Sequence, residues 1–581
     1  MASFMANWSA CLCLGDFTSQ DFGVASGLPQ GSLISLILFM LFIEPLFKYG
    51  PLAARRGQFS YADDICQLMA SPSLTENVAL LSNYIADIQT WAAGEGLAFN
   101  FSKSELQHFS WGGMEGDPPL SLSSSEGLHS ISSPEKGMAT CWLGIWFDWC
   151  LSFHPHCRVM AARAKQTAMG ILSLGNTAWG VKASLLKKVT TACVLSVLAY
   201  GAEAWWPGLF WQRKGQSISS RVGAAFSHLE RTFQQALWGS LPVYRTTPIP
   251  ILYWESATPP LELIFNHCWA LAHLQIACLD DRHPTHHHLS QAWPTNLHLH
   301  LHFLHPNCLE GLEHVNPLQF PPWQAPTKRN RAVICPDQEK APQDFSKWTS
   351  SLPPLSLLIF TDGSLQQTGS AGAGWAGFWG TASMEATCGH LSLAKHEVFN
   401  AEATAALAGL KAAFSCPHTH LSSNLYILLD NQEAALQLQG TPLCSSQSTF
   451  LEFQKVAKEW PSCPNHLHAL SPGWVQIHWI PGHSGIAGNE AADRQANLGA
   501  STPASALVNP PPTRLAWARR TLKKDLAKCF EDYWTNHAPQ SYKDLAIPLD
   551  PRPQELSLPQ GSLGRLLSAC SGHGDFAAYH E

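Results

Sequence analysis

Apolar and polar positions follow their most regular pattern between residues 355 and 500 of the 581-residue chain. Three strand-like runs come first, and segments with helical and strand periods then alternate. The predicted elements are strands at 355–364, 371–380 and 383–392, a helix at 396–414, a strand at 424–430, helices at 431–438 and 448–459, a strand at 473–480 and a helix at 489–499. This order predicts a mixed sheet with helices packed on it.

The first 280 residues show a different pattern. Residues 1–110 predict a mixed α/β segment with an apolar helix at 32–48, and residues 138–280 predict mainly helices. The apolar run at 33–43 is much shorter than the ~20 residues of a membrane-spanning helix, so it predicts a buried core helix. Residues 111–137 are rich in Gly, Ser, Pro and acid, which indicates a surface insertion.

The chain is therefore expected to be multidomain. The predicted segments are 1–137, 138–280, a Pro/His-rich linker at 281–354, 355–500, and a basic helix with a C-terminal segment at 501–581. The histidines of the linker indicate either a metal site or a polar connection. They are His283, His286, His287, His288, His298, His300, His302 and His305.

Charge and cysteine content narrow the functional classes. The net charge of -7 argues against a protein that binds nucleic acid by overall positive charge alone. It leaves room for metal ions that bridge acidic side chains to phosphates. The 17 cysteines form no CxxC pair, so we expect no zinc site and reduced thiols in an intracellular compartment, nuclear or cytoplasmic. No signal peptide, membrane segment or stable protein partner is indicated.

Four acids mark the segment 355–500. Asp362 ends a strand in "IFTDGS", Glu402 shares the apolar face of its predicted helix, Asp430 ends the apolar run "LYILLD", and Asp493 lies early in a helix after "WIPGHSG". Acids at strand ends and on an inward helix face indicate a catalytic or metal site. Each acid also has a simpler interpretation. Asp362 could belong to a turn and Glu402 could be a glutamate at the edge of its helix. Asp430 could cap the next helix, and Asp493 could stabilise a helix N-terminus by its charge.

The motifs together resemble type 1 ribonuclease H over about 355–500, above all the stretch "PGHSGIAGNEAAD". The resemblance implies that Asp362, Glu402, Asp430 and Asp493 bind two Mg²⁺ ions, with Mn²⁺ as a substitute, and that an RNA–DNA hybrid is the substrate. Two metals serve both ends of an in-line phosphodiester hydrolysis, and Mg²⁺ prefers oxygen ligands.

Other positions take roles from the same resemblance. His483 would assist proton movement or product departure. Substrate contacts would come from Gly363, Ser364, Asn431 and Gln432. Residues 437–475 hold only two lysines, so grip on the substrate must come from elsewhere. The basic helix at 514–528 is one candidate, and a solvated helix face is the alternative.

The first part resembles the reverse transcriptase of non-LTR retrotransposons. The motifs are "ASGLPQGSLISLILF", "YADD", "GLAFNFSKSE", "CWLGIWFD" and "VLAYGAEAWW", and the matching polymerase positions are Gln30, Asp63, Asp64 and Lys103. The family palm also has a first metal-binding Asp on an earlier strand, and only about 25 residues precede the "GLPQG" turn here. We therefore expect no polymerase activity.

Three functions remain open on the sequence. The favoured one is a Mg²⁺-dependent nuclease that cuts RNA in RNA–DNA hybrids, attached to a reverse transcriptase remnant. The second is a non-catalytic nucleic-acid-binding relic. The third is a working RNA-directed DNA polymerase whose missing strand is supplied from elsewhere.

Overall fold

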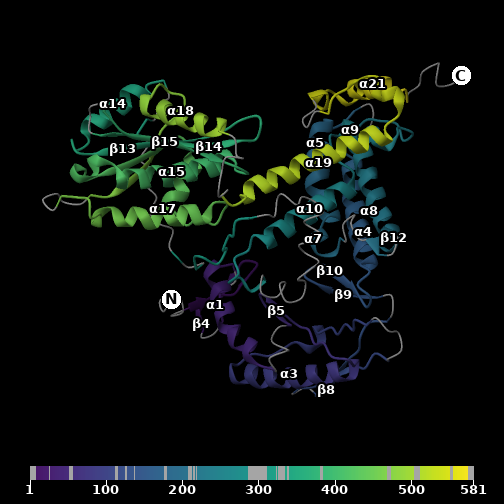
Figure 1. Cartoon of the computed structure of the whole chain (residues 1–581). Helices are drawn as coiled ribbons and strands as arrows, with labels where there is room; N and C mark the ends of the chain where they lie inside the picture. Colours follow the sequence, from purple (N-terminus) through teal and green to yellow (C-terminus); the bar gives the residue numbers. More distant parts are fainter. Residues whose placement is uncertain are drawn as a thin grey trace. The chain divides into compact units, whose positions relative to one another are not determined.

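The computed structural model divides into two compact units, Met1–Val159 and Met160–Glu581, and each is described by itself (Figure 1). It describes residues 8–573 except 25–26, 30, 51–56, 111–115, 125–126, 136–137, 176–178, 207–211, 214–215, 218, 286–310, 322–323, 325–333, 336–338, 380–383, 468–472, 503–510 and 550–553.

Short antiparallel strand pairs and two long helices make up the first unit. Its elements are β1 (Trp8–Ala10), β2 (Cys13–Leu14), β3 (Phe17–Thr18), β4 (Phe22–Val24), α1 (Leu33–Ile43), η1 (Glu44–Lys48), β5 (Gln58–Tyr61), β6 (Asp64–Gln67), α3 (Leu74–Gly94), η2 (Phe101–Lys103), β7 (Leu120–Ser124), β8 (Gly127–Ile131), β9 (Ala139–Trp142) and β10 (Ile145–Asp148). Helix α3 packs against η1 through Tyr84 and Ile88, which are buried beside Leu46.

Two expectations for this unit are wrong. Helix α1 is not a buried core helix, because Leu36 and Leu41 are about half exposed while Ile43 is buried. A helix that is apolar all round needs cover on every side, and α1 has cover on one side only. The insertion at 111–137 is not wholly a surface segment, because Leu120 and Leu122 of β7 are buried in a cluster below α3.

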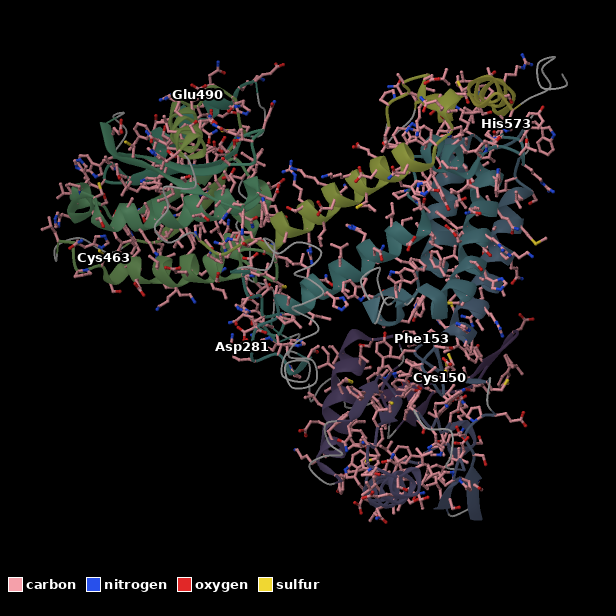
Figure 2. All side chains as sticks on the ribbon, turned by 45° about the vertical axis from the view of Figure 1, so that its right-hand side comes forward. Cys150, Phe153, Asp281, Cys463, Glu490 and His573 are labelled. Atoms are coloured by element: carbon pink, nitrogen blue, oxygen red, sulfur yellow. The ribbon has the colours of Figure 1, made fainter. Side chains whose placement is uncertain are left out.

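A buried carboxylate closes the loop after β10. Asp148 accepts hydrogen bonds from the Phe153 backbone N–H at 2.9 Å, the Ser152 hydroxyl at 2.7 Å and the Cys150 thiol at 3.1 Å. Figure 2 labels Cys150 and Phe153. These donors hold the pKa of Asp148 below its ordinary value although burial opposes ionisation. The loop is therefore fixed by its own acid.

The second unit begins and ends with helices. They are α4 (His154–Leu172), α5 (Ala183–Val189), η3 (Thr190–Leu195), α6 (Ser196–Leu198), α7 (Ala202–Trp205), α8 (Ser219–Ser240), α9 (Ile249–Glu255), α10 (Leu261–Ala277), α19 (Leu515–His537), α20 (Gln540–Lys543), η7 (Gln554–Ser557) and α21 (Gln560–Ser571), with a small pair β11 (Gln212–Arg213) and β12 (Gln216–Ser217). Helix α19 packs along α10, and Trp534 stacks on Trp254 at 4.3 Å between ring centroids.

One stretch of this helical part is apolar enough to be tested as a membrane span. Among the described residues, Ala183–Trp205 meets the length and composition of such a helix. That evidence is weak, because core helices of proteins outside membranes meet the same criterion.

Between α10 and α19 in the sequence, the chain forms a five-stranded mixed sheet. The strands are β13 (Leu357–Leu365), β14 (Ala371–Trp379), β15 (Met384–Leu393), β16 (Leu425–Leu429) and β17 (Val475–Trp479), in the order β15-β14-β13-β16-β17. Strands β13, β14 and β15 pair antiparallel, and β16 runs parallel to both β13 and β17. The predicted fold class is therefore confirmed.

Helices cover both faces of this sheet (Figure 1). One face packs on α15 (Val398–Ser415), α16 (Gln432–Gln439) and α17 (Gln447–Glu459), and the other on α14 (Ala341–Ser351) and α18 (Ala487–Ser501); short turns η4 (Pro417–Leu421) and η5 (Trp460–Ser462) complete the connections. Helix α14 lies in the expected linker, yet Phe345 and Trp348 pack on Phe360 and Tyr426 of the sheet. The packed domain therefore includes part of the linker.

Candidate active site

The Asp-Gly-Ser motif lies inside a strand. Asp362, Gly363 and Ser364 all pair with β14 within β13, and Asp362 is 7% exposed. A Cβ at Gly363 would lie 2.6 Å from the backbone nitrogen of Glu402, so glycine is needed for α15 to approach the strand. The turn that the motif allowed is therefore wrong.

Glu402 lies on the buried face of α15. Its side chain is 2% exposed, as the helical period predicts, whereas Glu397 caps the helix and pairs with Arg520. Glu402 Oε2 is buried and accepts no hydrogen bond from any described residue. A buried carboxylate oxygen without a donor is costly unless a proton or a cation neutralises it. The inward orientation is confirmed.

Asp430 directly follows β16, whose residues are all buried. The next residue, Asn431, caps α16 by accepting a hydrogen bond from the Ala434 backbone N–H at 3.0 Å. The cap that the sequence allowed for Asp430 thus belongs to Asn431. The Asp430 carboxylate instead accepts a hydrogen bond from Asn489 Nδ2 at 3.4 Å, and its backbone oxygen accepts one from Trp479 Nε1 at 2.8 Å.

Asp493 is presented by the close approach of α18 to the sheet. A Cβ at Gly374 of β14 would lie 2.1 Å from the backbone nitrogen of Ala496, so the helix backbone rests almost directly on the strand. Asp493 falls in the second turn of α18, while Glu490 occupies the first. The position that benefits from the helix dipole is therefore that of Glu490.

Three of the acids share one point in space. Ligand oxygens of Asp362, Glu402 and Asp430 all lie within 4.8 Å of one another. Burial, then the charge of Asp430 and a hydrogen bond with Asp493, raise the pKa of Asp362 to about 7. Burial and the charges of Asp362 and Asp430 raise the pKa of Glu402 well above its ordinary value. Like charges this close resist ionisation until a cation joins them.

The loop between β17 and α18 passes close to one of these acids. A Cβ at Gly482 would lie 2.5 Å from Asp430 Oδ2, so the loop passes directly over that carboxylate. His483 is the next residue, exposed and in the left-handed region with φ of 50°. Its predicted role stays a prediction.

The four expected substrate contacts differ in their exposure and in their partners. Ser364 donates a hydrogen bond to Asn497 Oδ1 at 2.6 Å, and Gln432 is exposed at the start of α16. Gly363 is buried under α15 and Asn431 caps α16, so each has a structural role. Contact of these residues with a substrate stays a prediction.

The basic helix is only partly available for nucleic acid. Arg514, which precedes α19, is buried and pairs with Glu313 at 2.9 Å. It also donates hydrogen bonds to His396 Nε2 at 3.0 Å and Thr449 Oγ1 at 3.1 Å. A solvated basic face remains, formed by the exposed Arg519, Lys523, Lys524 and Lys528.

The buried ion pair of Glu313 and Arg514 was not predicted from the sequence. Glu313 lies in a segment without periodicity, and nothing in its sequence context distinguishes it from a solvated linker acid. Asn489 and Asn497 were also missed as partners of the acids. Asn489 stands inside the "GNEAAD" motif, so its place beside an acid was the one available signal.

The polymerase-like residues lie in the first unit. Asp63 and Asp64 are exposed at the β5–β6 turn, where Ala62 has φ of 53°. Lys103 is exposed in η2, the short helix inside the motif "GLAFNFSKSE". Gln30 lies outside the described residues, as do the expected histidines other than His283.

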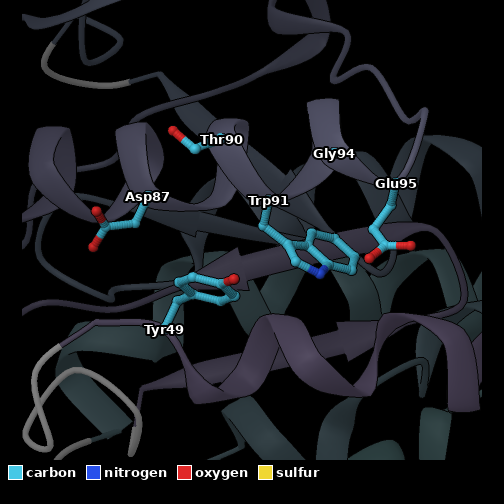
Figure 3. Close-up of a pocket in the computed structure, with 6 residues that line it drawn as sticks. All are labelled: Tyr49, Asp87, Thr90, Trp91, Gly94 and Glu95. Atoms are coloured by element: carbon cyan, nitrogen blue, oxygen red, sulfur yellow. The ribbon is translucent and has the colours of Figure 1, made fainter.

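The first unit also holds a polar hollow of about 370 Å³ between α3 and the end of η1 (Figure 3). Its lining includes the rings of Tyr49 and Trp91 and the carboxylates of Asp87 and Glu95. Two carboxylates repel phosphate groups. The hollow is therefore unsuited to a nucleic-acid backbone, and it lies in the unit that does not contain the acid cluster.

Comparisons with known proteins agree with the two-part organisation. The family model "RNase H" matches residues 354–501, and the model "Reverse transcriptase (RNA-dependent DNA polymerase)" matches residues 2–147. A search of curated proteins finds no match.

Several solved structures resemble the chain. Ribonuclease H1 from the archaeon Halobacterium salinarum is 21% identical, with 25% of this chain and 96% of that chain covered and a TM-score of 0.19. LC11-RNase H1 in complex with an RNA/DNA hybrid is 15% identical, with 25% and 99% covered and a TM-score of 0.20. The protease-reverse transcriptase of prototype foamy virus is 18% identical, with 25% and 21% covered and a TM-score of 0.20.

The order of the two family matches decides the assignment. The reverse transcriptase match covers most of the first unit, and the ribonuclease H match covers the five-stranded sheet with its acid cluster. The chain thus has a reverse transcriptase segment followed by a ribonuclease H domain, an order consistent with that of an RT–RNase H retroelement polyprotein.

Proposed function

We propose that residues 354–501 form a type 1 ribonuclease H that hydrolyses the RNA strand of RNA–DNA hybrids. The family match supports hydrolysis of such hybrids in general. The observation that carries the proposal is the gathering of Asp362, Glu402 and Asp430 within 4.8 Å at the edge of the matched domain. Metal-assisted hydrolysis of a phosphodiester needs acids held together in this way. Buried acids are otherwise costly to a folded protein.

The donor set fits divalent metal ions. The three carboxylates would hold a divalent ion such as Mg²⁺, because they offer oxygen ligands gathered within 4.8 Å of one another. Asp362 has a raised pKa and Glu402 Oε2 has no hydrogen-bond donor among the described residues, and a bound cation would stabilise both carboxylates. We assign two Mg²⁺ to these acids and Asp493, with Mn²⁺ as a substitute. When bound, such a pair activates the attacking water and stabilises the leaving oxygen.

The protein groups around the acids have separate tasks in this proposal. Asn489 donates to Asp430 and keeps its carboxylate turned to the cluster. His483, on the loop that crosses Asp430, carries protons between the site and solvent. Ser364 and Gln432 contact the substrate from the two sides of the cluster. A contact to the 2′-hydroxyl would distinguish RNA from DNA.

The test uses the full chain with a labelled RNA–DNA hybrid and Mg²⁺. We expect cleavage of the RNA strand, which Asp430→Asn abolishes because the cluster loses one of its three charges. The matched control is Glu433→Gln, three residues away and exposed, which should cleave at the unmodified rate. Equal cleavage by all three proteins, or none by the unmodified chain, refutes the proposal. Hybrid binding without cleavage would instead identify a non-catalytic relic.

We further propose that the first unit does not extend primers. Asp63 and Asp64 are exposed on a hairpin, and no third acid joins them within the described residues. Phosphoryl transfer needs a full set of charges around its metals. Metal-dependent extension of a primed RNA template by the purified chain would overturn this proposal and favour a polymerase.

A further inference from the structure

We propose that Asn497 is a positioning residue that holds the carboxylate of Asp493 at the metal cluster. The proposal rests on the ribonuclease H function proposed above. It assigns to this asparagine a task that neither the sequence motifs nor the cluster itself indicated.

A chain of two hydrogen bonds runs from the strand to the acid. The Ser364 hydroxyl donates to Asn497 Oδ1 at 2.6 Å, and Asn497 Nδ2 donates to Asp493 Oδ1 at 3.0 Å. Residues four apart on a helix lie on the same face, so Asn497 reaches Asp493 without distorting α18. The serine fixes which end of the amide faces the carboxylate, because a reversed amide would turn its oxygen against the acid.

Asp493 needs such support more than the other three acids. Asp362 and Glu402 are buried and held by packing, and Asp430 is crossed by the loop at Gly482. Asp493 is only partly buried. Its helix is held against β14 by backbone contact, but the rotation of its side chain is set by what the carboxylate touches.

Asn497 can therefore act on metal binding without touching metal or substrate. Groups that orient a ligand change metal affinity or activity by about 10–100-fold when they are removed. Because Asn497 is exposed, we expect the lower end of that range.

A second tie between the same two elements provides a matched control. Gln366 Nε2, just after β13, donates to Ser501 Oγ at 2.8 Å, one turn beyond Asn497. This bond also joins the strand end to α18, but among the described residues neither side chain hydrogen-bonds to an acid. If the Asn497 bonds only fastened the helix, loss of the Gln366 bond would have the same effect.

The experiment measures Mn²⁺ binding to the full chain by the loss of the free-ion signal in electron paramagnetic resonance. We expect Asn497→Ala to weaken binding about 10-fold and to raise the metal concentration for half-maximal cleavage by a similar factor. Alanine has a higher helix propensity than asparagine, so loss of α18 would not explain this result. Asn497→Gln retains an amide donor and should recover part of the affinity.

Two results would overturn the inference. One is unchanged Mn²⁺ affinity in Asn497→Ala, and the other is an equal loss in Gln366→Ala. The proposed function fails separately, when the unmodified chain does not cleave the hybrid. The resonance titration then still decides the role of Asn497, because it needs no turnover.

Discussion

Replacing Glu313 by glutamine should destabilise the ribonuclease H domain although Glu313 lies well before its first strand, which begins at Leu357. The side chains of Glu313 and Arg514 are 2% and 6% exposed. Glu313 Oε1 accepts hydrogen bonds from the Leu515 backbone N–H at 2.7 Å and from Ser445 Oγ. Its Oε2 accepts from the Ser446 backbone N–H at 2.9 Å and from Arg514 Nη1 at 2.9 Å. One carboxylate therefore joins three distant segments of the chain.

The size of the effect follows from these contacts. An amide keeps one oxygen and places a donor where the other stood. Whichever oxygen is lost, either the Leu515 or the Ser446 N–H faces a donor and stays unsatisfied, which costs about 1–3 kcal/mol. Arg514 also keeps its charge in a buried site without a counter-charge. Breaking one partner of a buried pair costs about 3–5 kcal/mol in all.

Hydrogen exchange of the full chain measures this cost locally. The amides of β13 and β16 are buried at the centre of the sheet and exchange only when the domain opens. A loss of about 3–5 kcal/mol corresponds to about 10²–10⁴-fold faster exchange in Glu313→Gln. Local probes are preferable because a chain of several domains does not unfold in one step.

A surface pair supplies the control. Arg520 of α19 pairs with Glu397 at the start of α15 but is 48% exposed, so Arg520→Ala should cost no more than about 1 kcal/mol. The reasoning is refuted if Glu313→Gln accelerates exchange by less than about fivefold, or no more than Arg520→Ala does.

Three further predictions concern titration and close packing. Burial and the charge of Arg514 lower the pKa of His396 to about 4, so the unfolded state binds more protons than the folded state between about pH 6.5 and pH 4. As pH is lowered through that range, the free energy of unfolding should fall by about 3 kcal/mol. His396→Asn should remove this slope in denaturant titrations at several pH values. In metal-free protein the raised pKa of Asp362 makes stability depend on pH in the opposite direction. The stability that its protonated carboxyl contributes is fully present below its unfolded pKa and is lost as pH rises through about 7. The melting temperature should therefore fall with rising pH, and Mg²⁺ should restore it. Gly374→Ala places a Cβ 2.1 Å from the backbone of Ala496, so it should destabilise the domain by about 1–3 kcal/mol or more and slow hybrid cleavage, measured by chemical denaturation and by rate.

Local periodicity was sufficient to predict most of the ribonuclease H domain. The run at 425–429 is apolar throughout because β16 is buried on both faces, and the glycine-rich run of β14 stays a strand because its neighbours supply the register. The Asp-Gly-Ser turn was wrong for a related reason. Gly363 favours a turn locally, but pairing with β14 and the approach of α15 need a glycine in an extended strand.

Contacts between distant segments could not be read in this way. Residue 313 stands in a segment whose local pattern shows no element, and its burial depends on Ser446 and Arg514, more than 130 positions away. The exposed face of α1 illustrates the reverse error. An apolar helix predicts burial, yet whether each face is covered depends on elements that periodicity does not specify.

The site itself shows why its acids were detectable and their support was not. Three carboxylates in one place repel, so the rest of the fold must hold them there. Glycine allows the backbone to pass close to an acid at two places, Gly363 beside Glu402 and Gly482 beside Asp430. Both glycines stand in the sequence motifs next to a candidate residue. Asn497 does it by hydrogen bonding from outside any motif. Chemistry that must contact the substrate restricts residue types along the sequence, whereas support can come from any residue that the fold brings near.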